Sequence, residues 1–154
     1  MTVIHGYMHD DHRSCDELFV AVESAVVDQD WDRARSTWRR FSGALLRHFV
    51  MEEDVLFPKL EEATGMSGGP TDVMRMDHAQ LRAMLPTLEA ALLDGNADDF
   101  LGNSQAMMVL MQQHNMKEEQ VLYPMADQAL TDGAAIVHAM EDCGGRVDGA
   151  EPKV

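Results

Sequence analysis

Two short stretches of this sequence place a glutamate four residues after a histidine. His48 precedes Glu52, and His114 precedes Glu118. Four residues make about one turn of an α-helix, so each pair lies on one helix face, separated by about 6 Å along the axis. A single buried histidine is most simply a hydrogen-bonded core residue. A repeated imidazole–carboxylate pair indicates a metal site.

Both pairs belong to a repeat with a constant offset of 66 residues. The Asp-His at residues 11–12 recurs at residues 77–78, and residues 48–58 (HFVMEEDVLFP) recur as residues 114–124 (HNMKEEQVLYP). Each half places its second histidine 36 residues after its first. The pattern predicts a helix pair that has been duplicated without a net insertion between these marks.

Helix start and stop signals place the elements that must carry these residues. Asp30 and Asn96 can each cap the N-terminus of a helix, and Gly95 suits the end of the helix before it. The Gly- and Pro-containing run at residues 65–70 separates the two halves. With such short connections, we predict an all-α, up-down-up-down four-helix bundle with an internal two-helix repeat. The expected helices span about residues 8–28, 31–60, 70–94 and 97–130.

Three prolines lie within these helices. Pro58 and Pro124 should end or kink the second and fourth helices, because proline removes an amide donor and crowds the preceding turn. Pro86 permits a bend in the third helix. The bundle domain should span residues 1–143, with a short final helix near 134–142. The polar, Gly-rich segment 144–154 is expected to be a flexible tail.

Apolar side chains surround the imidazole–carboxylate pairs at helical spacing. Phe41, Leu45 and Val55 share the helix face of His48 and Glu52. The equivalent residues of the second half are Met107, Met111 and Val121. Both pairs should therefore face the core of the bundle.

His12 and His78 also lie on apolar helix faces, so each helix points one histidine inward. Burying bare carboxylates and imidazoles costs several kcal/mol for each unpaired charge, and bound metal ions would compensate for that cost. Two ions can fit between four helices, and mixed nitrogen and oxygen ligands suit Fe, Mn or Zn. The candidate metal ligands are His12, His48, Glu52, His78, His114 and Glu118.

Several neighbouring residues have simpler interpretations. His9 could be a further ligand, but a solvent-facing position near a helix start is the preferred interpretation. Cys15 is interpreted as a buried structural thiol. Core packing is the expected role of four methionines, with a gas-accessible pocket beside the metals as the alternative. These methionines are Met8, Met74, Met107 and Met111.

Acidic residues adjoin the candidate ligands in both halves. Asp11 and Asp77 precede a histidine, and each could orient an imidazole or lie on the surface. Adjacent helical residues point about 100° apart, so Asp11 is not expected to bond to His12. Glu53 and Glu119 are expected to be solvated.

The charge of the chain excludes some partners. Its formal net charge is −15, which disfavours nucleic acid and anionic membrane surfaces. No secretory signal and no apolar run of bilayer length is visible, so a cytoplasmic location is the default expectation. The sequence does not indicate a protein partner. Two cysteines imply no dense disulfide framework.

At these residues the sequence resembles the hemerythrin-like, or HHE cation-binding, family. The resemblance covers residues 11–124, through two Asp-His elements and two His-x-x-x-Glu-Glu elements that end in proline. It implies a four-helix bundle with two iron ions, although Zn or Mn could replace iron. His12 and His48 would bind one ion and His78 and His114 the other. The bridges would be Glu52, Glu118 and an oxo or hydroxo group.

The sequence also departs from the oxygen-carrying hemerythrins. Those proteins have a third histidine on one iron, where this chain has Met74, and Met8 is its counterpart in the first helix. Glu52 or Glu118 also replaces a bridging aspartate. The pattern is more similar to bacterial di-iron proteins of the repair-of-iron-centres group, which respond to nitric oxide and oxidative stress.

The leading functional prediction is a protein that binds O2, NO or peroxide at an open metal position, in stress response or iron-centre repair. The alternatives are oxygen carriage or redox sensing, a di-iron oxidase or peroxidase, an iron donor, and a metal-free scaffold. No side chain stands out as a general acid or base, which favours binding over catalysis.

Overall fold

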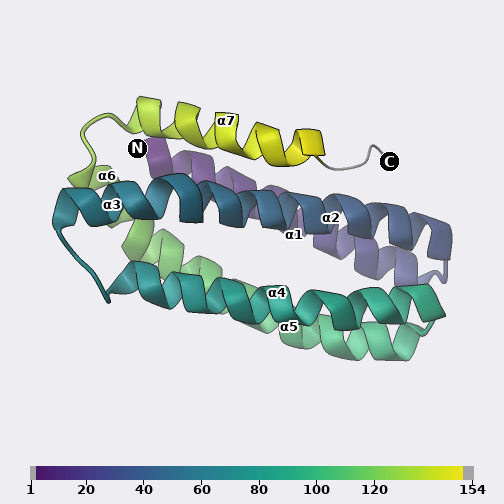
Figure 1. Cartoon of the computed structure of the whole chain (residues 1–154). Coiled ribbons are helices and arrows are strands. Elements are labelled where there is room, and N and C mark those ends of the chain that lie inside the picture. Colours follow the sequence, from purple (N-terminus) through teal and green to yellow (C-terminus); the bar gives the residue numbers. More distant parts are fainter. Residues whose placement is uncertain (1–2, 151–154) are drawn as a thin grey trace.

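The computed structural model describes the backbone of residues 3–150 and the side chains of residues 3–143. This part of the chain is helical and contains no β-strand. Four long rods run antiparallel to their neighbours in the chain, which confirms the predicted four-helix bundle (Figure 1). The elements are α1 (Val3–Val27), α2 (Trp31–Met51), η1 (Glu52–Leu56), α3 (Phe57–Thr64), α4 (Pro70–Asp94), α5 (Ala97–Lys117), η2 (Glu118–Leu122), α6 (Tyr123–Ala129) and α7 (Gly133–Ala150).

The second and fourth rods are each interrupted by a π-helical turn. Segment η1 joins α2 to α3, and η2 joins α5 to α6. Phe57 N–H donates to the Glu52 carbonyl and Tyr123 N–H to the Glu118 carbonyl, both five residues back. The widened turn lies directly before Pro58 and Pro124, whose rings would crowd a carbonyl four residues back.

Of the two effects predicted for Pro58 and Pro124, ending the helix does not occur. Each proline lies in the first turn of the helix that follows the π turn, and the rod continues to Thr64 in the first half and Ala129 in the second. In both halves the π turn begins at the glutamate of the imidazole–carboxylate pair. The predicted ligands therefore sit where the helix changes its winding.

The predicted helix caps are present. Asp30 and Asn96 accept hydrogen bonds from the backbone N–H of Arg33 and Asp99, at 3.3 Å and 3.0 Å. Gly95 ends α4 in the left-handed conformation with φ of 65°, and its backbone packs against the Trp31 ring. Helix α1 begins at least five residues earlier than the predicted start at residue 8.

The apolar core forms two clusters with a polar layer between them. One cluster includes Phe19, Phe41 and Phe100, and the other includes Met8 and Phe57. The four methionines that were expected to pack the core are all buried within these clusters; they are Met8, Met74, Met107 and Met111. On α1, His12 lies between the Met8 cluster and the Phe19 cluster. The predicted ligands are therefore enclosed from both ends of the bundle.

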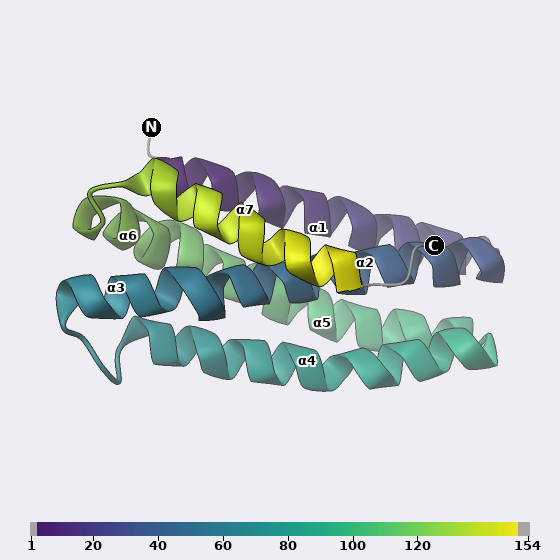
Figure 2. The same ribbon diagram turned by 45° about the horizontal axis from the view of Figure 1, so that its top comes forward.

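Helix α7 lies outside the four rods, against α1 and α2 (Figures 1 and 2). It buries Ile136, Met140 and Cys143. The final helix predicted near 134–142 is therefore present but longer, since the segment 144–150, expected to be a tail, is helical. The rest of the expected tail, residues 151–154, lies outside the described residues. Within the described part of the chain, no helix is both long and apolar enough to cross a membrane.

The cap at Asn96 gives a prediction about stability. Asn96→Ala should lower the free energy of unfolding by about 1 kcal/mol, because the Asp99 N–H loses its acceptor. Urea denaturation measures the change. Asn96→Asp keeps an acceptor and should unfold close to the wild-type midpoint. Equal stability of the alanine and wild-type proteins would contradict the capping role.

Candidate metal centre

All six predicted ligands lie together in the layer between the two apolar clusters. They come from four different rods, and each is at most 4% exposed. They are His12 of α1, His48 of α2, Glu52 of η1, His78 of α4, His114 of α5 and Glu118 of η2. Their role as metal ligands stays a prediction, but the proximity that this role requires is present.

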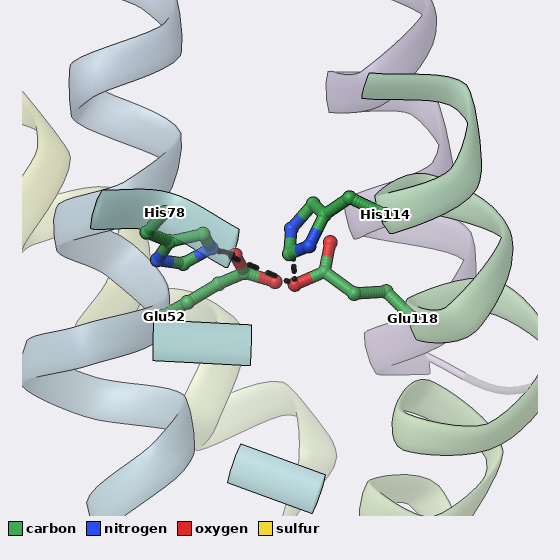
Figure 3. A group of neighbouring side chains, drawn as sticks. All are labelled: Glu52, His78, His114 and Glu118. Carbon is green, nitrogen blue, oxygen red and sulfur yellow. Dashed lines mark ion pairs between the residues drawn. The ribbon is translucent and has the colours of Figure 1, made fainter. Parts of the chain in front are cut away.

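The Nε2 atoms of the histidines point toward the two glutamates. Glu118 faces both halves, because its Oε1 lies 2.9 Å from His12 Nε2 and its Oε2 lies 3.2 Å from His114 Nε2. Glu52 Oε1 lies 3.0 Å from His78 Nε2 and 3.4 Å from His48 Nε2. Figure 3 shows the group formed by Glu52, His78, His114 and Glu118. Each carboxylate thus contacts histidines of both halves, as a bridging ligand would.

The ligand atoms form two sets that could each hold a metal ion. One set contains Glu52, His78, His114 and Glu118, and the other contains His12, His48 and Glu118. Within each set the atoms lie within 4.8 Å of one another. Glu118 belongs to both sets, so two ions held there would be close neighbours sharing that carboxylate.

Unsatisfied polar atoms show that these residues fit a metal. Glu52 Oε1, Glu118 Oε2 and the Nε2 atoms of His78 and His114 are buried and lack a hydrogen-bond partner among the described residues. His78 Nε2 and Glu52 Oε1 are 3.0 Å apart, yet they are not aligned as a hydrogen bond. Leaving such atoms unpaired costs about 1–3 kcal/mol each, and a cation between them removes that cost.

Each of the four imidazoles also forms a hydrogen bond from its Nδ1 atom to a further carboxylate. Two of these carboxylates are the aspartates that precede a histidine. His48 Nδ1 donates to Asp11 at 2.7 Å, and His114 Nδ1 donates to Asp77 at 3.0 Å. As expected, Asp11 does not bond to its neighbour His12. It reaches the histidine of the next helix instead, which assigns both aspartates an orienting role.

The other two carboxylates contradict the sequence-based prediction. Glu53 and Glu119 were expected to be solvated, but their side chains are only 23% and 25% exposed. Glu53 accepts from His78 Nδ1 at 2.6 Å, and Glu119 accepts from His12 Nδ1 at 2.7 Å. The Glu-Glu pair in both repeats was the sequence feature that could have predicted these contacts. The first glutamate of each pair faces the centre, and the second reaches a histidine of the adjacent helix.

Basic residues hold several of these outer carboxylates. Arg82 binds both oxygens of Glu53, at 2.8 and 2.9 Å, and Lys117 Nζ lies 2.7 Å from Asp77. A carboxylate can only accept a hydrogen bond, so each Nδ1 carries the proton. This arrangement leaves every Nε2 directed at the centre, as a metal-ligating histidine requires.

The charges of the centre shift the pKa values of its members. Burial acts to lower the pKa of His78, but the nearby carboxylates of Glu118, Glu52 and Glu53 outweigh it and raise the pKa to about 10. Burial acts to raise the pKa of Glu118, but the charge of His114 and hydrogen bonds hold it well below its usual range. Without metal, imidazolium protons therefore balance the carboxylates, and a binding cation would displace those protons.

His9 does not join the centre. Its side chain is 44% exposed and its Nδ1 bonds to Glu119 at 2.8 Å, on the side of that carboxylate away from the metal layer. His9 is absent from both sets of potential ligands. Its position agrees with the preferred interpretation of a histidine near the surface.

The sequence analysis missed one functional side chain, Tyr123. Its hydroxyl is fully buried and lies 2.7 Å from Glu52 and 2.8 Å from Glu118. Burial and the charges of these two glutamates raise the pKa of the Tyr123 hydroxyl well above its usual value. The sequence feature that could have identified Tyr123 is a difference between the two repeats: its counterpart in the first half is Phe57, which has no hydroxyl.

The outer carboxylates give a prediction about metal binding. Glu53→Gln should weaken metal affinity about 10–100-fold, because His78 loses the charged acceptor that fixes its orientation. Competition with a chelator for Fe(II) and for Zn(II) measures the affinity. Asp54→Asn alters the exposed neighbouring carboxylate and should change the affinity little. Equal affinities for the Glu53 and Asp54 variants would refute the orienting role.

Comparison with known proteins agrees with this geometry. Residues 3–126 match the family model of the hemerythrin HHE cation-binding domain. The chain is also 29% identical, over 133 residues, to an uncharacterised hemerythrin-like protein of Schizosaccharomyces pombe. That alignment covers 86% of this chain and 63% of the relative's length. No solved structure gives a significant match. With a buried histidine–glutamate cluster that suggests a metal site inside the matched region, the chain belongs to the hemerythrin HHE cation-binding family.

Proposed function

We propose that this protein holds a non-haem di-iron centre that binds a small ligand such as O2, NO or peroxide. His12 and His48 would hold one iron, His78 and His114 the other, with Glu52 and Glu118 bridging. When bound, the metal pair supplies redox chemistry and an electrophilic position for the ligand. The observation that carries the proposal is the shared contact of two buried carboxylates with four inward-facing imidazoles.

Iron is favoured over zinc or manganese by the family resemblance, since ligand type alone does not select one metal. Four neutral imidazoles and two carboxylates would leave a di-iron pair with a positive charge. Such a centre attracts anionic or electron-rich ligands. The chemistry is consistent with a role in oxidative or nitrosative stress, or in repair of iron centres.

A small cavity beside the imidazoles supports a small ligand. Its volume is about 10 Å³, which is room for one water-sized molecule. Three of the four histidines contribute to its wall, and most of the remaining wall is apolar. The lining residues are His12, Cys15, Leu45, His48, Phe49, Leu81, Met111, His114 and Asn115. A cavity of this size suits a diatomic molecule and is too small for larger substrates.

A surface pocket supplies an access route to this cavity. It has a volume of about 320 Å³ and lies between α1 and α5, with Arg13, Gln112 and Gln120 in its wall. His12 and Asn115 line both the surface pocket and the inner cavity. A ligand that enters between α1 and α5 would therefore pass these two side chains before it reaches the metals.

The proposal predicts a spectroscopic response. Protein loaded anaerobically with Fe(II) should bind two irons per chain and develop new visible absorption when NO is added. His114→Ala removes one ligand, so it should bind less iron and lose most of this response. Iron analysis and optical titration measure both. A wild-type protein that binds iron but does not react with NO, O2 or peroxide would refute the proposed function.

The cavity gives a second prediction. Leu81→Phe should fill the cavity and weaken NO binding to the iron-loaded protein at least about 10-fold, since the larger ring would occupy the space beside the imidazoles. Leu88→Phe enlarges a buried residue of the same apolar cluster that does not line the cavity. Both variants should retain iron, and NO titration compares them. Equal weakening in both would assign the effect to overpacking rather than to the cavity.

A further inference from the structure

We propose that the phenol oxygen of Tyr123 is a protein ligand of the metal held by His12 and His48, and that it makes the two metals inequivalent. This inference rests on the proposed di-iron centre and adds a ligand that the two-histidine pattern does not contain.

The position of the hydroxyl carries the argument. The Tyr123 oxygen lies 3.2 Å from His12 Nε2 and 3.4 Å from His48 Nε2. It lies 2.7 Å from Glu52 Oε2 and 2.8 Å from Glu118 Oε1. All four atoms are proposed metal ligands. An ion that contacts these atoms must also contact the oxygen that lies among them.

Hydrogen bonding leaves one of the two carboxylate contacts of Tyr123 unexplained. A phenol has one proton, so it can donate to only one of the two carboxylates at a time. Tyr123 is 0% exposed, and water therefore cannot complete its contacts from bulk solvent. A cation satisfies the phenol oxygen, both imidazoles and both carboxylates together. On ligation the phenol proton leaves to solvent, and the phenolate adds one negative charge to the centre.

The π turn positions the tyrosine for this contact. Tyr123 follows Glu118 by five residues, which in an α-helix would point the two side chains about 140° apart. Segment η2 replaces that turn with a wider one, in which Tyr123 N–H bonds to the Glu118 carbonyl. The two side chains then lie on one face, with Glu118 Oε1 and the phenol oxygen 2.8 Å apart.

The first half of the chain lacks an equivalent of Tyr123, so the metal of His78 and His114 would have no phenol ligand. The residue 66 positions before Tyr123 is Phe57, whose ring stacks on His78 at a centroid distance of 5.7 Å and offers no oxygen. The set around His78 contains four histidine and glutamate ligands, whereas the set around His12 contains three. Tyr123 completes the poorer set. With the phenol oxygen, the set around His12 would also contain four ligands, one of them a phenolate, so the two metals would differ in ligand type.

Resonance Raman spectroscopy of the ferric, iron-loaded protein tests this assignment. Excitation into the visible band should give ring modes of an iron-bound phenolate, and ring-deuterated tyrosine should shift them. Tyr123→Phe should abolish the modes and the band and weaken retention of one of the two irons about 10-fold. The chain has only two tyrosines, so Tyr7→Phe is a matched control and should keep all three properties.

The outcomes separate this inference from the proposed function. Two bound irons with no phenolate modes in the wild-type protein would overturn the role of Tyr123 and leave the di-iron centre intact. Phenolate modes that persist in Tyr123→Phe would overturn it as well. A wild-type protein that binds no iron would overturn both proposals. If Tyr123→Phe does not fold, the isotope shift in Tyr7→Phe, which contains Tyr123 as its one tyrosine, decides the matter.

Discussion

The structure depends on one electrostatic constraint: two fully buried carboxylates, Glu52 and Glu118, must be neutralised inside an apolar bundle. Uncompensated charges in such an interior cost several kcal/mol each. Four imidazoles surround them, and the carboxylates raise the pKa values of His48, His78 and His114, which favours their protonation without metal. The two apolar clusters enclose this layer on either side, and an exchange of protons for metal ions would let the core keep its charge balance.

The balance of charge continues outward from the two buried glutamates to the surface. Each imidazole donates a hydrogen bond from Nδ1 to a carboxylate. Arg82 and Lys117 bind two of those carboxylates near the surface. Charge therefore alternates from the centre to the solvent. Every bond in the ring of carboxylates links two different rods, so the same contacts that orient the ligands also fix the rotation of the helices. Metal binding and bundle packing are coupled through this ring.

The duplication explains the near symmetry of the centre, and one residue pair breaks it. Both halves supply an Asp-His, a His-x-x-x-Glu-Glu and a π turn before a proline. Tyr123 and Phe57 occupy matching positions with different chemistry: one places an oxygen among the ligands and the other stacks on His78. A duplicated fold can thus surround two similar sets of side chains with different chemistry.

The sequence by itself determined the bundle, the helix caps and the six inward-facing residues, because helix periodicity and capping are local properties of the chain. Only the tertiary structure decided the partners of Glu53 and Glu119, since those depend on how neighbouring rods are rotated against each other. It also decided the direction of Tyr123. In an ideal α-helix the side chain of residue 123 would point away from Glu118. The π turn that precedes Pro124 brings the two side chains to the same helix face, inside the packed core.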